Sequence, residues 1–251
     1  MRRRTASASS GFWRISAGAV ALALMAGASL AQDQKQAPSS PVGGAVPGGA
    51  APGFSTQVKP APQAVAGITL EPQQIELVNK VSGFFNELQN LRGTFVQTTA
   101  DNKRLRGKFY VKRPGRLRFE YSLPSKQLIV SDGQQLAIQD LDLKTDDRMG
   151  LDQTVFRILL RKDVDLMRDA RILEVQEAND LIVLSLQDKS PDTSGRIKLF
   201  MAKGPTSLEI KEWVTTDAQG EVRVELSSTN RSEEIDPGLF KIVNPSLQKG
   251  N

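Results

Sequence analysis

Neither cysteine nor histidine occurs in the 251 residues of this chain. Their absence excludes a disulfide framework, a lipid-modified N-terminal cysteine and every catalytic site that depends on a thiol or an imidazole. It also removes the usual ligands of zinc, copper, haem and iron-sulfur clusters, so we expect no metal and no cofactor. Catalysis by paired carboxylates needs neither residue and is considered below.

The first 31 residues have the three parts of a secretory signal peptide. Four arginines and no acidic residue accompany an apolar run over residues 15–30, and the small residues Ser29 and Ala31 stand at the −3 and −1 positions of a cleavage site. The run is too short and too rich in alanine and glycine for a permanent membrane span. We therefore expect cleavage near Ala31 and export across the inner membrane.

Positive charge is concentrated in this leader. The formal net charge of the whole chain is +5, and removal of the four leader arginines leaves +1 for the mature chain. Binding of nucleic acid depends on clustered contacts of Lys and Arg with phosphates, and a nearly neutral chain gives little support for it. We expect no nucleic-acid partner.

The mature chain is predicted to hold one domain between two flexible ends. Residues 32–68 are rich in Pro, Gly, Ala, Gln and Ser and have too few apolar side chains to offset the entropy cost of ordering. This segment is therefore predicted to be a flexible tether. Residues 69–245 carry the hydrophobic patterns of a folded domain, and residues 246–251 form a short tail.

An amphipathic helix of about 18 residues is predicted to open the domain. Apolar side chains recur at helical spacing from Ile75 through Phe85 to Leu88. Thr69 is the predicted N-cap, and Pro72 falls in the first turn, where its missing N–H does little harm. The polar face is not rich in Lys and Arg, which favours packing against the rest of the domain over binding to a membrane surface.

After Gly93 the hydrophobic period changes from that of a helix to that of a β-strand. Short turns such as Asp132-Gly133 separate the segments, which predicts an antiparallel meander. In one of the last segments Leu208, Ile210 and Val214 are predicted to share a face. The predicted strands are residues 93–99, 104–113, 116–122, 126–131, 134–140, 143–149, 171–177, 181–188, 195–202, 207–216 and 220–230.

Residues 105–121 form two strand-like runs joined by a Pro114-Gly115 turn. Apolar side chains such as Leu105 and Phe109 point to one face of the first run, and Lys and Arg alternate with them on the other. Arg113 is separated from Leu105 and Phe109 by an even number of positions, so its side chain is predicted to point to the same face as theirs. A guanidinium directed to an apolar face needs hydrogen-bond partners.

The very apolar segment 152–160 interrupts the strands and is predicted to form one or two helical turns capped by Asp152. The roughly eleven strands then form one long, curved antiparallel sheet with an apolar and a charged face. The two helical segments are the elements available to cover the apolar face. A sheet of this length tends to roll up, and with few bulky inward groups it encloses a cavity lined mainly by Leu, Ile and Val.

Several motifs follow one another along the domain. Phe84-Phe85 leads to Leu91-Arg-Gly-Thr-Phe-Val-Gln97, and segment 107–121 is followed by Pro124, by Leu128-Ile-Val-Ser-Asp-Gly133 and by the apolar segment 155–161. In this order and spacing they resemble the periplasmic outer-membrane lipoprotein carrier family, LolA. The Lys-Arg-Pro and Val-Ser-Asp-Gly pieces are the most specific, and the resemblance spans about residues 73–245.

The resemblance implies an unclosed antiparallel β-barrel with an α-helical lid over a hydrophobic cavity. It implies a periplasmic carrier, expected to be a monomer, that takes triacylated lipoproteins from an ATP-driven complex in the inner membrane to an outer-membrane acceptor. The arginine of the family's Lys-Arg-Pro motif, which ties the lid to the barrel, corresponds to Arg113. The side chains expected to line the acyl-chain cavity are Phe95, Phe109, Val111, Leu117, Phe119, Leu128, Val130, Phe156, Leu159, Leu160 and Leu199.

The chain departs from the family where many members have tryptophan. Phe109 and Phe119 stand at aromatic positions, and residues 136–139, which follow Val-Ser-Asp-Gly, lack the aromatic side chains that are common there. These differences concern the shape and selectivity of the cavity and leave the expected fold unchanged.

Two other functions agree with parts of the sequence. The first is a hydrolase with a carboxylate pair, although a solvated strand face shared by Asp140 and Asp142, together with a solvated turn, explains these carboxylates more simply. The candidate carboxylates are Asp140, Asp142, Asp146, Asp147, Asp163 and Asp165.

The second is a related lidded half-barrel that binds another lipid or amphiphile, or that senses envelope stress. A membrane-anchored acceptor with this fold needs a lipidated N-terminal cysteine, which the chain lacks. A stress regulator usually carries a second domain, and we expect none after about residue 245.

Overall fold

The computed structural model describes residues 67–193 and 195–245. The predicted signal peptide (1–31), the predicted tail (246–251) and all but the last two residues of the predicted tether (32–68) lie outside the described residues. Apart from residue 194, the structure covers the region for which a folded domain is predicted.

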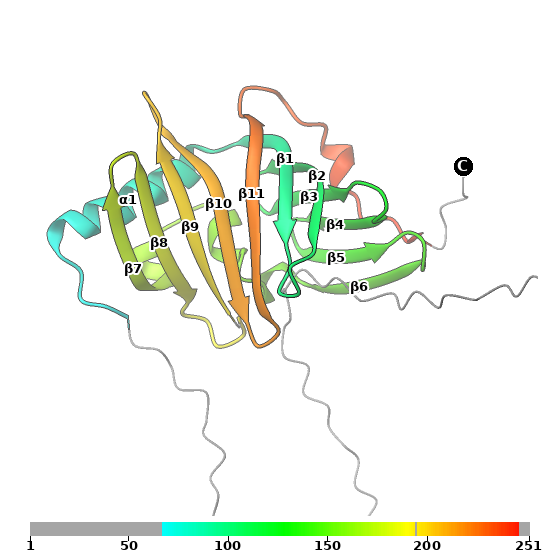
Figure 1. Ribbon diagram of the computed structural model, residues 1–251, viewed down its shortest axis with the longest axis horizontal. Helices are drawn as coiled ribbons and strands as arrows, with labels where there is room; N and C mark the ends of the chain where they lie inside the picture. Colours follow the sequence, from blue (N-terminus) through cyan, green and yellow to red (C-terminus); the bar gives the residue numbers. More distant parts are fainter. Residues whose placement is uncertain (1–66, 194, 246–251) are drawn as a thin grey trace, which may run out of the picture.

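Eleven strands make up the single sheet of the described chain, namely β1 (Asn90–Thr98), β2 (Arg104–Lys112), β3 (Arg116–Tyr121), β4 (Gln127–Asp132), β5 (Gln135–Asp140), β6 (Thr145–Gly150), β7 (Ala170–Ala178), β8 (Leu181–Asp188), β9 (Arg196–Lys203), β10 (Leu208–Asp217) and β11 (Gly220–Asn230). Their order is β6-β5-β4-β3-β2-β1-β11-β10-β9-β8-β7, and every pairing is antiparallel. Two meanders meet where β1 pairs with β11, which leaves β6 and β7 as the free edges (Figure 1). The predicted unclosed antiparallel sheet is confirmed, and each predicted strand matches an observed one within three residues at either end.

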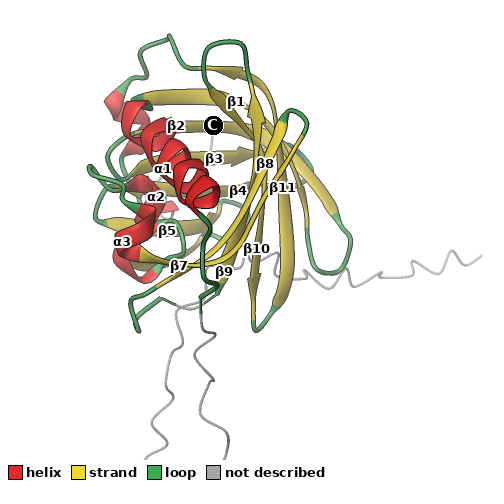
Figure 2. Cartoon of the chain, turned by 90° about the vertical axis from the view of Figure 1, so that its left-hand side faces the viewer, coloured by secondary structure: helices red, strands yellow, loops and turns green. Residues whose placement is uncertain are grey.

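The first helix, α1 (Pro72–Glu87), lies across the concave face of the sheet (Figure 2). Its N-cap is Glu71, so the prediction of Thr69 as the cap was wrong. The Gln74 side chain accepts a hydrogen bond from the Glu71 backbone N–H at 3.0 Å, and Pro72 fills the first helical position, where no N–H is needed. Ahead of the helix, the N–H of Ile68 donates to the Ile172 carbonyl at 3.0 Å on the β7 edge.

Three short helical pieces connect β6 to β7, namely η1 (Leu151–Gln153), α2 (Arg157–Leu160) and α3 (Leu166–Asp169). Asp152 lies inside η1 and does not cap a helix, because the Leu151 N–H already bonds to the Gln134 carbonyl at 2.8 Å and the turn starts one residue earlier. With α1 these pieces form the helical layer over the concave face (Figure 2). We call α1 together with residues 151–169 the lid.

A β-bulge in β10 changes which side chains face the concave side. The register with β9 shifts between Ile210 and Glu212, so Ile210 lies opposite Met201 while Trp213 lies opposite Leu199. Trp213 therefore points inward and Val214 outward. The predicted alternation of Leu208, Ile210 and Val214 on one face was wrong at Val214, because a bulge inserts one extra residue.

The C-terminal segment covers part of the outer, convex face. It contains η2 (Pro237–Phe240), and its carbonyls at Leu239 and Val243 accept hydrogen bonds from Arg118 at 2.9 Å and Gln139 at 2.8 Å. Beneath it a small second cluster of buried side chains consists of Leu128, Val130 and Ala137, packed against Ile242. Both faces of β4 are consequently buried.

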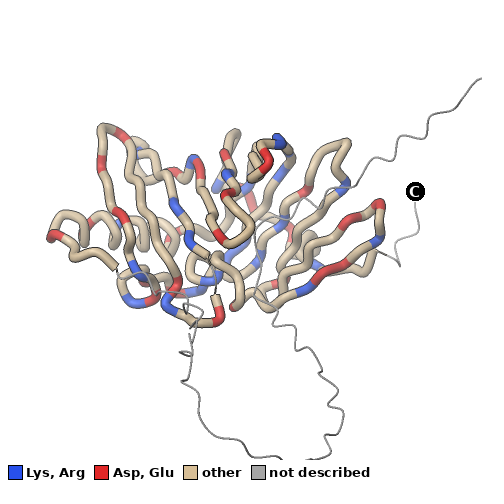
Figure 3. The backbone as a smooth tube through the Cα atoms, turned by 60° about the horizontal axis from the view of Figure 1, so that its bottom comes forward, with Lys and Arg blue, Asp and Glu red and all other residues tan. Residues whose placement is uncertain are grey.

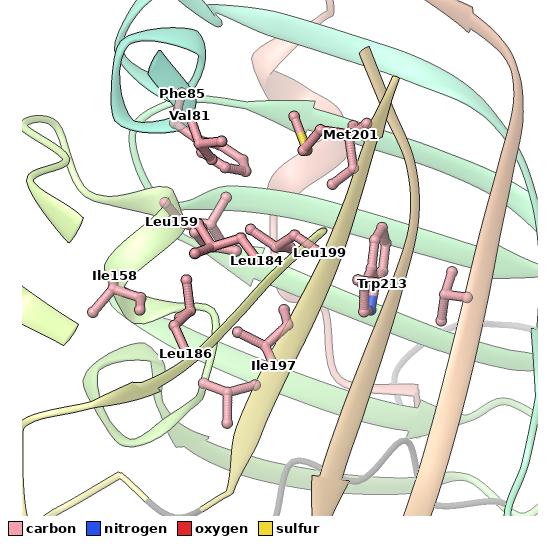
Figure 4. Close-up of a cluster of buried hydrophobic side chains, with 14 of the residues drawn as sticks. Val81, Phe85, Ile158, Leu159, Leu184, Leu186, Ile197, Leu199, Met201 and Trp213 are labelled. Atoms are coloured by element: carbon pink, nitrogen blue, oxygen red, sulfur yellow. The ribbon is translucent and has the colours of Figure 1, made fainter. Parts of the chain in front are cut away.

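The main hydrophobic core lies between the lid and the concave face of the sheet. Val81 and Phe85 of α1 and Ile158 and Leu159 of α2 face inward-pointing side chains of β8, β9 and β10 (Figure 4). The sheet side of this group consists of Leu184, Leu186, Ile197, Leu199, Met201 and Trp213.

Candidate functional site

A small apolar cavity lies between the lid and the sheet. Its volume is about 70 Å³, and Arg113 is the only charged residue among the described residues that line it. Sites for drug-sized ligands measure roughly 300–1,000 Å³. The cavity is therefore in a closed form, largely filled by its own side chains.

Most of the predicted cavity side chains do line this cavity. They are Phe109, Val111, Leu117, Phe119, Phe156, Leu159, Leu160 and Leu199. Phe95 is buried behind them, where its ring meets those of Phe119 and Tyr121 edge-on at 5.0 and 5.1 Å. Leu128 and Val130 belong to the cluster on the outer face, so their placement in the cavity was wrong.

The burial of both faces of β4 explains this error. Its apolar run Leu128-Ile-Val130 has no alternation, because the C-terminal segment covers the outer face, and Ile129 is the residue that reaches the cavity. Sequence reasoning also missed Trp213, because the bulge in β10 hides its direction. The lining residues absent from the prediction are Phe85, Leu88, Leu91, Ile129, Leu136, Ile197, Ile210, Trp213 and Leu226.

Arg113 follows β2 and joins the barrel to the lid. Its side chain is 8% exposed, and its Nη2 donates to the main-chain carbonyl of Arg161 at the end of α2. A second, long contact of 3.5 Å runs from Nη1 to the Leu88 carbonyl beyond α1. Burial lowers the pKa of this guanidinium below its ordinary value. We call Arg113 with these two carbonyls the latch.

Only some of the hydrogen-bond donors of Arg113 in the latch have acceptors. The Nε of Arg113 is buried without a hydrogen-bond partner in the described chain, and the contact with Leu88 is at the outer limit of hydrogen-bond length. An unmade hydrogen bond of a buried group costs about 1–3 kcal/mol. The arrangement holds the lid, yet little free energy is needed to displace it.

Further polar contacts hold the parts of the lid to each other and to the sheet. Within the lid, the Asn86 side chain of α1 pairs with the backbone N–H and carbonyl of Val164 at 2.8 and 2.9 Å. Between lid and sheet, Arg157 of α2 forms a two-pronged ion pair with Asp188 of β8, with both distances 2.8 Å. The hydrogen bond to Asp188 raises the pKa of Arg157, and the Asp188 side chain is only 1% exposed.

The candidate catalytic carboxylates do not converge on the cavity. Asp140 accepts hydrogen bonds from turn N–H groups at 2.9 and 3.0 Å, and Asp142 pairs with Lys126 at 2.7 Å. A hydrogen bond from Arg148 holds the pKa of Asp146 below its ordinary value. Asp163 pairs with Arg168 at 3.0 Å. Asp142 lies in the turn after β5, so the expectation that it shares a strand face with Asp140 was wrong.

Lys and Arg are interspersed with Asp and Glu along the described strands and turns (Figure 3). Many of them pair across the outer face of the sheet, as Arg223 does with Glu212 at 2.7 Å and Lys198 with Glu174 at 2.7 Å.

Within residues 67–193 and 195–245, no helix combines the length and the apolar character needed to cross a membrane.

A curved, open antiparallel sheet with a helical lid over an apolar cavity defines the class of lidded half-barrels. The sequence model of the family described as "Outer membrane lipoprotein carrier protein LolA" matches residues 86–243, more than half of the chain. The chain belongs to this family.

Curated relatives agree with this assignment. The outer-membrane lipoprotein carrier protein of Alkalilimnicola ehrlichii is 29% identical over 179 residues, covering 64% of this chain and 77% of the relative. That of Chromobacterium violaceum is 27% identical over 189 residues, covering 72% of this chain and 90% of the relative.

Solved structures with low identity also superimpose on the chain. A LolA superfamily protein from Nitrosomonas europaea gives a TM-score of 0.41 at 11% identity and covers 69% of this chain and 99% of its own. The complex structure of Pseudomonas aeruginosa MucA/MucB gives 0.39 at 12% identity and covers 69% and 62%. Scores at this level carry no functional argument, and family membership rests on the sequence match.

Proposed function

We propose that this protein is a periplasmic carrier of acylated lipoproteins, which takes them after release from the inner membrane and delivers them to the outer membrane. The observation that carries the proposal is an apolar cavity under a lid held by a buried, partly satisfied arginine. The family match and the relatives named as lipoprotein carriers support it. The signal peptide predicted for residues 1–31 supports export to the periplasm. The proposed partners are triacylated lipoproteins, an ATP-driven releasing complex and an outer-membrane acceptor.

The physical need for a carrier follows from the hydrophobic effect. Each methylene group transferred from water to an apolar site is worth about 0.8 kcal/mol, so three acyl chains with about 40 methylenes would cost on the order of 30 kcal/mol in water. Such cargo does not cross an aqueous compartment unprotected. The carrier must nevertheless release it, which favours a cavity that can close again over one that binds as tightly as possible.

The closed cavity is too small for acyl chains, so loading requires the lid to move. Acyl chains would separate the α1 and α2 side chains from the sheet and replace their contacts with contacts to hydrocarbon. Because the acyl chains then cover the apolar side chains that the lid leaves, the protein itself loses little buried apolar area, and opening the lid around cargo costs much less than opening it in water. The latch then adds a modest bias toward closure, which helps to expel the cargo at its destination.

Mass spectrometry of the protein purified from its own periplasm tests this proposal. The preparation should contain an acylated protein bound in a one-to-one complex, and mild detergent should release it. Phospholipid or another amphiphile in place of any acylated protein would contradict the proposal and favour a carrier of a different lipid. A variant with Leu199→Glu, which places a charge in the cavity wall, should purify without the acylated protein.

A further inference from the structure

A second and larger space lies beside the latch. It is an open groove of about 620 Å³ between the β2–β3 turn, the β4–β5 turn and the first half of residues 151–169. This volume is within the range of roughly 300–1,000 Å³ that small-molecule sites occupy. Its charged lining residues are Arg116, Asp132, Asp152, Arg157 and Arg161. We call it the arginine groove.

The arginine groove and the apolar cavity meet at the latch. Leu160 lines both spaces, Arg113 lines the cavity, and Arg161 and Gly115 line the groove. The hydrogen bonds from Arg113 to the Arg161 carbonyl and from the Gly115 N–H to the Leu160 carbonyl, the latter 2.8 Å long, run across this boundary. Opening of the lid would break these bonds and join the two spaces into one, with an apolar inner part and a polar mouth.

The arginine groove has unused hydrogen-bond donors. Arg157 pairs with Asp188 through Nε and Nη2, which leaves Nη1 free of a described partner, and Arg161 makes a single ion-pair contact of 3.1 Å with Asp169. The side chain of Arg116 has no hydrogen bond or ion pair within the described residues. Three guanidinium groups with spare N–H donors suit a ligand that is rich in oxygen acceptors.

The acidic residues of the groove determine which acceptor it suits. Asp132 and Asp152 lie beside the arginines, so a negatively charged phosphate would meet like charge as well as opposite charge. Uncharged ester and amide carbonyls accept hydrogen bonds from arginine without this repulsion. The lining therefore favours a neutral, carbonyl-rich ligand over a phospholipid headgroup.

We propose that the arginine groove binds the polar end of the acylated cargo, namely the ester and amide carbonyls around the acylated cysteine and the first peptide groups that follow. This inference rests on the proposed function, because it requires acyl chains to occupy the neighbouring cavity. Arg116, Arg157 and Arg161 donate to the carbonyls while the acyl chains lie under the lid. The groove thereby orients the cargo with its protein part directed out of the mouth.

Binding measurements on the full mature chain test the inference. The probes are a synthetic tripalmitoyl-cysteinyl peptide with uncharged residues and the apolar dye N-phenylnaphthylamine, which has no carbonyl group. Arg116→Gln removes no contact within the described chain, and Arg161→Gln keeps the main-chain carbonyl that the latch uses. Because each hydrogen bond to a charged group is worth enough for about a tenfold change in affinity, the double variant should bind the lipopeptide at least tenfold more weakly. Its affinity for the dye should not change.

A matched control is Arg106→Gln, since Arg106 is an exposed arginine on the outer face of β2. It should bind both probes like the wild type. Equal lipopeptide affinity for the double variant and the wild type would overturn the inference and leave the proposed function intact. Dipalmitoyl phosphatidylglycerol serves as a third, phosphate-bearing probe. A loss of affinity of the double variant for this lipid alone would also overturn the inference, because the groove would then be a phosphate site. Failure of the wild type to bind either apolar probe would overturn the proposed function itself.

Discussion

Arg113 is a buried cation. In the closed form its shortest polar contact is the hydrogen bond that its guanidinium donates to a main-chain carbonyl of the lid. A hydrogen bond of this kind, with a charged donor, contributes about 1.5–3 kcal/mol, but the unpartnered Nε offsets part of that gain. The net bias toward closure is therefore small. A residue in this position can control the proposed release of cargo without determining whether the protein folds.

Replacement of this arginine by leucine should separate loading from delivery. Arg113→Leu removes the bond to the Arg161 carbonyl and places an apolar side chain on an apolar wall, so the fold should persist. With closure weakened by about 1.4 kcal/mol, lipopeptide should bind about tenfold more tightly. Transfer to outer-membrane vesicles should slow correspondingly, as measured with a fluorescent lipopeptide.

Arg106→Leu is the control for the loss of an arginine, because the exposed side chain of Arg106 lies on the outer face of β2, the strand that Arg113 follows. That variant should deliver cargo at the wild-type rate. Normal delivery by Arg113→Leu would show that the latch has no part in release.

The sequence predicts the direction of a side chain only where strand parity is unbroken. Arg113 could be identified because β2 alternates without interruption and leaves one guanidinium on the apolar parity. Leu128 and Val130 were misplaced because β4 is apolar on both faces, and Trp213 was missed because a bulge precedes it. In β4 the deciding contact comes from a distant part of the chain, and in β10 it is one extra residue in the strand; local alternation contains neither.

Among the elements, α2 depends most on a long-range contact. A helix of four residues is too short to be stable alone, and here it packs three consecutive buried side chains and holds Arg157 against Asp188 of β8. The predicted Asp152 cap failed because tertiary hydrogen bonds, not a capping side chain, fix this segment. The equally short α3 had no periodicity that could predict it. The long elements, α1 and the strands, could be predicted because their patterns repeat.

The ion pair should account for much of the stability of the lid. Asp188→Asn leaves Arg157 half-buried without its counter-charge and should lower the free energy of unfolding by about 2–3 kcal/mol. Amide exchange in residues 151–169 should rise more than in the sheet. Urea denaturation and hydrogen exchange measure these two effects.

Asp163→Asn provides the comparison, because Asp163 is 74% exposed and its pair with Arg168 lies at the surface of the same segment. It should change stability by no more than about 0.5 kcal/mol. An equal loss in both variants would mean that the buried pair adds nothing beyond its surface counterpart.

At the scale of the whole molecule, the cavity of about 70 Å³ is too small for the proposed cargo, whose binding would require a displacement of the lid relative to the barrel. The sheet has a continuous hydrogen-bonded ladder through β1 and β11, whereas the lid is attached to it by side chains and a few turn contacts. We therefore expect the lid to be the part that moves.

Spin-label distances should report this movement, and the absence of cysteine from the sequence makes labelling specific. One label is placed at Lys162→Cys in the lid and the other at Lys108→Cys on the outer face of β2. The distance between these two labels should increase when lipopeptide is added. Labels at Lys108→Cys and Gln219→Cys, both on the barrel, should keep their distance. An unchanged lid distance with bound lipopeptide would contradict opening.

The contacts on the β7 edge have a consequence for the proposed carrier of hydrophobic cargo. An unprotected edge strand offers a ladder of backbone groups to which another chain can add, and this is a common route to aggregation. Here Ile68 and the Gln74 side chain occupy the carbonyls of Ile172 and Val175, and the opposite edge carries adjacent charges in β6. Strand addition between neighbouring copies is thus disfavoured at both ends of an open sheet, so the barrel can stay unclosed for the proposed cargo without polymerising.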